Sequence, residues 1–116
     1  MNTENITLVT VDVDIRFIKS NALEVTLTVP ENERHKNFTL KAMAEELNGA
    51  VAYRSHRSID HYNAKVTYKW KNETWSGINP FNHITKTIEE LETAFRFFEL
   101  EGYDVKVGKL NVTTPN

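Results

Sequence analysis

The chain has 116 residues, a net charge of −2 and no cysteine. This length fits one domain over residues 1–116, and the lack of cysteine excludes disulfides, thiolate metal ligands and a cysteine nucleophile. The apolar runs are far shorter than the roughly 18 residues that cross a bilayer, and the first residues lack the basic and apolar blocks of a signal peptide. We therefore expect a cytoplasmic protein without a membrane partner.

Strict alternation of apolar and polar side chains predicts a long antiparallel hairpin at the start of the chain. Apolar residues occupy every second position from Val9 to Phe17 and again from Leu23 to Val29. A period of two is typical of strands with one buried face. Residues 19–21 supply the turn, and Pro30 ends the second strand because it cannot donate to a ladder.

A short helix and less regular strands are expected next. Residues 31–37 are polar and predict a loop, and Thr39 is a suitable N-cap for a helix that ends at Gly49. Strands follow around 51–53 and 66–70, with a polar loop or frayed strand end at 54–61. A further short strand is expected around Trp75.

The second helix has the clearest periodicity. Thr87 and Glu90 have the spacing of a capping box, and Gly102 ends the helix. One face carries Ile88, Leu91, Phe95 and Phe98, which we expect to pack against Val11, Val13, Val25 and Leu27 of the hairpin. Phe97 and Leu100 lie beside this stripe, either for burial under the hairpin or for a dimer contact. The opposite face is acidic and is interpreted as solvated.

The last strand begins at Tyr103. Its apolar residues alternate up to Val107, and Gly108 then shifts the alternation to Leu110 and Val112, as a β-bulge would. The full order is ββαβββαβ, which predicts an α+β fold with one antiparallel or mixed sheet of five to six strands and two helices. Two arrangements remain open: a ferredoxin-like sheet, if the first strand and the short fifth strand are left out, and a partly closed small barrel.

The charge is unevenly distributed. Residues 53–71 contain five cations and one carboxylate, a formal charge of +4, although the whole chain carries −2. Aromatic residues are interleaved with these cations, and cations with aromatic rings are what single-stranded nucleic acid requires for phosphate contacts and base stacking. The candidate nucleic-acid-binding residues are Arg54, Arg57, Tyr62, Lys65, Lys69 and Lys71.

A purely structural interpretation of this segment is also open. Tyr68 and Trp70 share a strand face with Val66 and fit a core position, whereas Lys65 and Lys69 fit an ordinary solvated face that protects the strand from edge pairing.

The sequence offers little support for catalysis or cofactors. His56, Asp60 and His61 have metal-ligand chemistry, but their spacing matches no standard motif. Asp12 and Asp14 share a strand face and are interpreted as its wet side. No glycine-rich phosphate loop is present, so we expect no enzyme activity, no cofactor and no metal.

These observations predict a small non-enzymatic intracellular binding domain that contacts RNA or single-stranded DNA through residues 53–71, in a regulatory role. The alternative is a protein-binding adaptor or inhibitor that uses its sheet edge or a helix face and binds no nucleic acid. Its partner would be another protein or a second copy of the chain.

Overall fold

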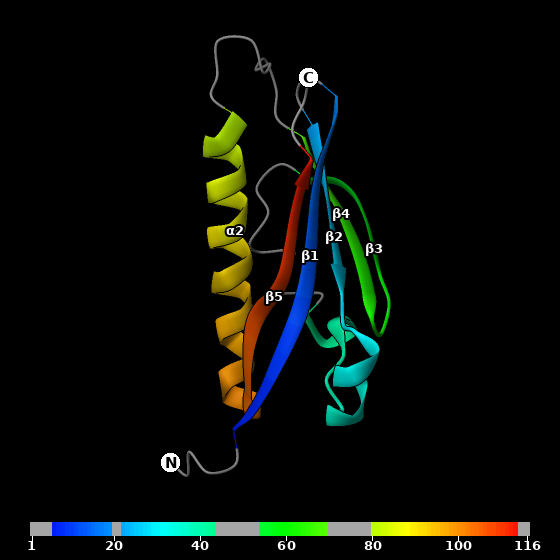
Figure 1. Ribbon diagram of the computed structural model, residues 1–116, viewed down its shortest axis with the longest axis vertical. Helices are drawn as coiled ribbons and strands as arrows, with labels where there is room; N and C mark the ends of the chain where they lie inside the picture. Colours follow the sequence, from blue (N-terminus) through cyan, green and yellow to red (C-terminus); the bar gives the residue numbers. More distant parts are fainter. Residues whose placement is uncertain (1–5, 20–21, 44–53, 70–79, 114–116) are drawn as a thin grey trace.

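The computed structural model describes residues 6–19, 22–43, 54–69 and 80–113. Within them, five strands form one open, mixed sheet in the order β3-β4-β2-β1-β5, and helix α2 covers one face (Figure 1). The predicted α+β class with a single sheet is therefore confirmed. The strands are β1 (Thr7–Lys19), β2 (Ala22–Thr28), β3 (Arg54–Ile59), β4 (Asn63–Lys69) and β5 (Tyr103–Thr113). The helices are α2 (Pro80–Arg96) and the short 3-10 helices η2 (Glu31–Lys36), η3 (Leu40–Met43) and η4 (Phe97–Glu101).

The hairpin of β1 and β2 forms as predicted. The two strands pair in antiparallel register from Asp12 opposite Thr28 to Lys19 opposite Ala22. The alternation of β1 agrees with the burial of its side chains: the apolar side chains at positions 9, 11, 13 and 15 are at most 2% exposed. The polar residues between them lie on the face away from α2, which is largely open to solvent.

The apolar stripe of α2 covers this hairpin. Leu91, Phe95 and Phe98 are at most 3% exposed and belong to one core cluster with the hairpin residues Val11, Val13, Val25 and Leu27. Ile88 packs against the same cluster and is partly buried. The predicted packing of the second helix is confirmed.

The strand order differs from the ferredoxin-like arrangement. That arrangement leaves out the first strand and places the last strand next to β2. In the structure β1 lies between β2 and β5, and it pairs in parallel with β5 from Thr7 opposite Tyr103 to Arg16 opposite Thr113. Because the apolar side chains of β1 are as deeply buried as those of β2, this strand belongs inside the sheet.

The start of α2 is a second correction. Thr87 is not an N-cap: the helix begins at Pro80, and Thr87 is 5% exposed in its interior. Proline is favoured in the first helical turn because its missing N–H would have no partner there. The apolar face extends back to Ile84, which is 6% exposed. At the other end α2 continues into η4, and this helical segment ends at Gly102, as predicted, where φ is 91°.

Two segments contain more regular structure than predicted, residues 31–37, predicted as a loop, and residues 54–61, predicted as a loop or a frayed strand end. Residues 31–37 include η2, and residues 54–59 form β3, which pairs with β4 from Arg54 opposite Tyr68 to Ile59 opposite Ala64. Of the predicted first helix the structure describes only the start, where Leu40–Met43 is a 3-10 helix. The strands predicted at 51–53 and around Trp75 lie outside the described residues.

Candidate docking site at the edge of β5

The strand β5 forms one edge of the sheet. It pairs with β1 on one side, and no described strand pairs with its other side. Residues 108–113 are all exposed, and Leu110 and Val112 keep 44% and 37% of their surface accessible. The backbone groups of such an edge are available to another strand. We call the unpaired side of residues 103–113 the β5 edge.

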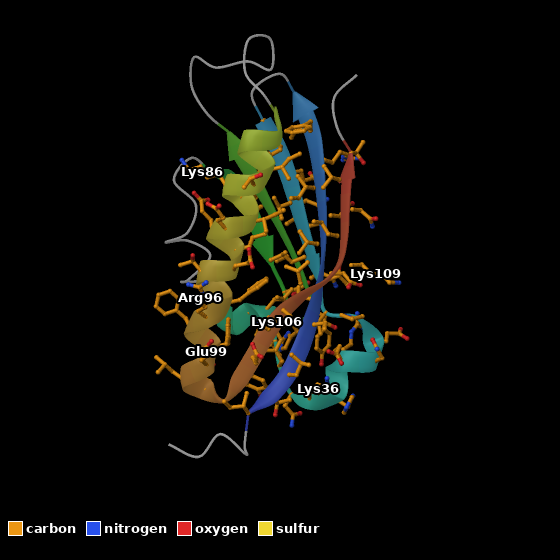
Figure 2. All side chains as sticks on the ribbon, turned by 60° about the vertical axis from the view of Figure 1, so that its left-hand side comes forward. Lys36, Lys86, Arg96, Glu99, Lys106 and Lys109 are labelled. Carbon is orange, nitrogen blue, oxygen red and sulfur yellow. The ribbon has the colours of Figure 1, made fainter. Side chains whose placement is uncertain are left out.

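A bulge at Gly108 shapes this edge, as the sequence predicts. The register with β1 shifts between Val11 and Val13, and the backbone N–H of Lys109 donates to Asp12 Oδ1 at 2.9 Å. A Cβ on residue 108 would lie 2.7 Å from the same oxygen, so a larger residue here would force the Asp12 carboxylate to shift and would disturb this hydrogen bond. The side chain of Lys109 points away from α2 (Figure 2).

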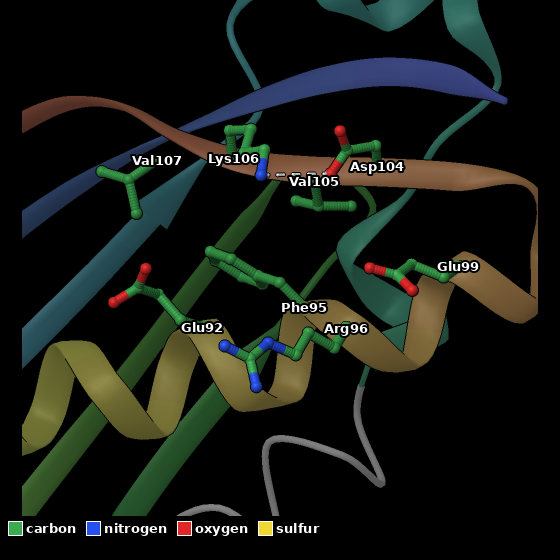
Figure 3. Close-up of a pocket in the computed structure, with 8 residues that line it drawn as sticks. All are labelled: Glu92, Phe95, Arg96, Glu99, Asp104, Val105, Lys106 and Val107. Atoms are coloured by element: carbon green, nitrogen blue, oxygen red, sulfur yellow. Dashed lines mark ion pairs between the residues drawn. The ribbon is translucent and has the colours of Figure 1, made fainter.

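A groove of about 310 Å³ runs between α2 and β5 (Figure 3). We call it the α2–β5 groove. The carboxylates of Glu92 and Glu99 reach toward the strand on either side of the Phe95 ring (Figure 3). The residues that line it are Glu92, Phe95, Arg96 and Glu99 on the helical side and Asp104, Val105, Lys106 and Val107 on the strand.

The charges of the groove are only partly neutralised. Lys106 Nζ lies 3.5 Å from Asp104 Oδ1. Glu92, Arg96 and Glu99 are all exposed, and none of the ion pairs among the described residues involves them. The groove therefore combines an apolar floor with charged groups that a partner could neutralise.

A second hollow of about 260 Å³ adjoins the groove, because Arg96 lines both. Thr93, Phe97 and Leu100 complete it. Phe97 and Leu100 are 54% and 89% exposed, so the predicted alternative in which the hairpin buries them is wrong. The dimer contact stays a prediction.

A buried carboxylate on η2 holds the N-terminal part of β1 through hydrogen bonds. Glu33 on η2 is 6% exposed, and its Oε1 accepts hydrogen bonds from the backbone N–H of Thr10 at 2.7 Å and from the Thr10 hydroxyl at 3.0 Å. Its Oε2 lies 2.7 Å from Lys36 Nζ. The hydrogen bonds from Lys36 and Thr10 lower the pKa of Glu33 to about 2. We call these three residues the Glu33 clasp.

The segment of η2 also anchors the first residue of β5. η2 lies on the side of the sheet opposite α2 (Figure 1). The hydroxyl of Tyr103 donates to the carbonyl oxygen of Asn37 at 3.2 Å, and its ring centroid lies 5.4 Å from that of Phe38. These contacts hold Tyr103, the first residue of the β5 edge, against the segment that follows η2.

Tyr62, a predicted base-stacking residue, is engaged within the protein. Its ring is partly buried against the core, and the guanidinium carbon of Arg34 lies 4.5 Å from the ring centroid. Arg34 also donates to the carbonyl oxygen of Val29 at 3.0 Å. A base could stack on this ring face only by displacing Arg34.

Lys65 lies on the open face of the sheet and is partly neutralised. Its side chain is 51% exposed, and its Nζ lies 3.9 Å from Glu24 Oε1. The same oxygen lies 3.3 Å from Arg16. One carboxylate thus sits between two cations, and a phosphate contact by Lys65 stays a prediction.

Three of the other predicted nucleic-acid-binding residues lie on β3 and β4. Arg54 and Arg57 belong to β3, Lys69 ends β4, and Lys71 lies outside the described residues. Arg57 pairs with the buried Val66, whereas Ser58 pairs with Lys65. Because directly paired residues occupy the same face of a sheet, the register places positions 57 and 65 on opposite faces. The contribution of these residues to binding stays a prediction.

The groups considered for catalysis and metal binding have other surroundings. Asp12 accepts the hydrogen bond of the bulge, and Asp60 and His61 are exposed. The described segments contain no cluster of three or more histidine, cysteine, aspartate or glutamate residues suited to a metal ion. No helix in the described part of the chain is long and apolar enough to cross a membrane.

Local sequence patterns do not reveal the α2–β5 groove. Helical periodicity assigns Glu92, Arg96 and Glu99 to a solvated face, and alternation assigns Asp104 and Lys106 to the wet side of a strand. These residues line one groove because β5 is an edge strand beside α2, which depends on the strand order. The usable signal is Gly108, whose bulge marks β5 as irregular, and bulges are frequent at sheet edges.

Comparison of the chain with protein-family models, with curated proteins and with solved structures found no match.

Proposed function

We propose that this protein is a non-enzymatic protein-binding domain that accepts an extended segment of a partner along the β5 edge. The observation that carries the proposal is that an eleven-residue strand next to a groove has one side with which no strand of the described residues pairs. In strand addition, main-chain hydrogen bonds supply affinity and pockets for alternate side chains supply specificity. The β5 edge offers the hydrogen-bonding groups, and the α2–β5 groove offers such a pocket.

Exposed apolar side chains support the same function. Leu110 and Val112 are in register with the buried residues Val13 and Ile15 of β1. They therefore extend the apolar face of the sheet to its edge, where they are more than one third exposed. An added strand would cover them with its own apolar residues, which is a favourable burial.

Binding of RNA or single-stranded DNA through residues 53–71 is the rival proposal. Two contacts weigh against it: Arg34 lies over the Tyr62 ring, and Glu24 partly neutralises Lys65. Strand addition at the β5 edge does not require Tyr62 or Lys65 to be free, so these two contacts are compatible with it.

The proposal is tested with a labelled, capped peptide of alternating valine and threonine, by fluorescence anisotropy. We expect the double variant Leu110→Lys/Val112→Lys to bind this peptide about tenfold more weakly, because lysines on an edge strand oppose pairing. Leu100→Lys is the matched control, since Leu100 is 89% exposed but lies on η4, and it should bind as the parent does. Absence of peptide binding to the parent protein, or equal binding by parent and double variant, would contradict the proposal.

A further inference from the structure

The charges on β5 bear on which strand could pair with its edge. Lys106 and Lys109 are exposed, and Lys106 is balanced by Asp104 at 3.5 Å. The described contacts of Lys109 involve its backbone N–H, and its side chain extends away from α2 (Figure 2). On the sheet face away from α2, β5 therefore carries the Lys109 ammonium group, for which the described part of the chain provides no ion-pair partner.

A second copy of the chain is a poor occupant of this edge. An antiparallel pair of β5 strands that used their full length would be centred on Gly108, the midpoint of Tyr103–Thr113. That register would bring Lys106 and Lys109 of one copy close to the same lysines of the other. Like charges on adjacent strands repel, and the two bulges would meet at the centre of the pair, where they interrupt regular pairing.

The occupied side of β5 shows which pattern this strand accepts. There β1 directs buried valines toward α2 and presents Thr10, Asp12 and Asp14 on the open face, next to β5. Asp12 contacts β5 directly through the backbone of Lys109. On its occupied side β5 thus pairs with a strand whose apolar residues face the helix, and it accepts one carboxylate, that of Asp12, on the open face, while Thr10 lies opposite Lys106.

We infer that the occupant of the β5 edge is an extended segment of another protein in which apolar and acidic side chains alternate. Its apolar residues lie on the α2 side, beside Leu110 and Val112, and its carboxylates face Lys106 and Lys109. This inference rests on the proposed strand addition and adds the chemical class of the partner. Lysines at an edge exclude unmatched strands, and complementary charge selects the matched one.

The test compares three capped peptides of equal length, in which valine alternates with glutamate, with threonine or with lysine. The full chain should bind the glutamate peptide about tenfold more tightly than the threonine peptide, and the lysine peptide least tightly. In the double variant Lys106→Glu/Lys109→Glu this order should reverse. Both lysines are exposed, so the variant should fold, which circular dichroism verifies. Because the selectivity is electrostatic, added salt should reduce it.

The outcomes separate the two claims. Equal binding of all three peptides would overturn the inference and leave strand addition in place. Failure of all three to bind would overturn both. Concentration-dependent dimerisation of the parent in analytical ultracentrifugation, abolished by Leu110→Lys/Val112→Lys, would also overturn the inference, because the occupant would then be a second copy. The inference is supported if the parent protein is a monomer and the order of peptide affinities is reversed in Lys106→Glu/Lys109→Glu.

Discussion

At the scale of single residues, Glu33 makes the free energy of unfolding depend on pH in the acidic range. Its pKa is lowered from 4.5 to about 2 in the folded protein by the hydrogen bonds from Lys36 and Thr10. A carboxyl group whose folded pKa is depressed contributes stability above its unfolded pKa and loses it as pH falls through the folded value. The Glu33 clasp should therefore weaken between pH 4.5 and about 2.

Substitution of Glu33 tests this linkage. Glu33→Gln should lower the free energy of unfolding at neutral pH by about 1–3 kcal/mol, because a buried charged hydrogen-bond acceptor is lost. It should also reduce the loss of stability between pH 4.5 and about 2. Thr10→Val, which removes one donor at 3.0 Å, should have an intermediate effect. Urea unfolding across this pH range measures both, and identical pH profiles for parent and Glu33→Gln would refute the assignment.

Gly108 and Asp12 form a second residue-scale device. A methyl group at position 108 would approach Asp12 Oδ1 to 2.7 Å, so Gly108→Ala should cost about 1–3 kcal/mol through overpacking. The double variant Gly108→Ala/Asp12→Ala lacks the closest contact and keeps the 3.2 Å approach to Thr10 Cβ, so the two effects should not add. A double-mutant cycle from urea unfolding measures this coupling. Additive effects would show that the carboxylate does not limit position 108.

At the scale of elements, residue spacing predicts what is buried better than where an element begins. The positions of Leu91, Phe95 and Phe98 follow from the period of the helix, and all three are in the core. The start of α2 is missed because Thr87 and Glu90 imitate a capping box inside the helix. Thr87 instead lies buried inside the helix, a position that depends on the tertiary fold and not on the local sequence.

Two phenylalanines of this helical segment, separated by one residue, offer a matched pair. Phe95 is 2% exposed and Phe97 is 54% exposed. Phe95→Ala should cost about 3–5 kcal/mol, because it leaves a cavity in the core. Phe97→Ala should change the free energy of unfolding by no more than about 0.5 kcal/mol. Thermal and urea unfolding measure both, and comparable losses in the two variants would disprove the packing of α2.

At the scale of the whole molecule, strand order is the property that the sequence leaves undetermined. The alternation of β1 predicts its burial, but the pattern does not state which strands flank it. The position of β1 between β2 and β5 leaves β5 at the edge. The candidate site follows from that placement. The uneven charge of residues 53–71, which is visible in the sequence, predicts a different site, on β3 and β4.

The rival nucleic-acid function has a simple test in the intact protein. If docking uses the β5 edge alone, a single-stranded oligonucleotide should bind weakly, and Lys69→Glu/Lys71→Glu should leave that binding unchanged. Phosphate-driven binding would instead show a steep linear decrease of log affinity with log salt, and the double variant would reduce the slope by about one for each lost contact. Anisotropy titrations at several salt concentrations distinguish these outcomes.

The most direct test of strand addition is to locate the bound peptide on the protein. In a nuclear magnetic resonance titration of the ¹⁵N-labelled protein with the alternating valine–glutamate peptide, we expect the largest amide shifts in residues 103–113. Slowed hydrogen exchange should occur at the β5 amides that point away from β1, since these would become hydrogen-bonded. Shifts centred on β3 and β4, with β5 unchanged, would contradict the account.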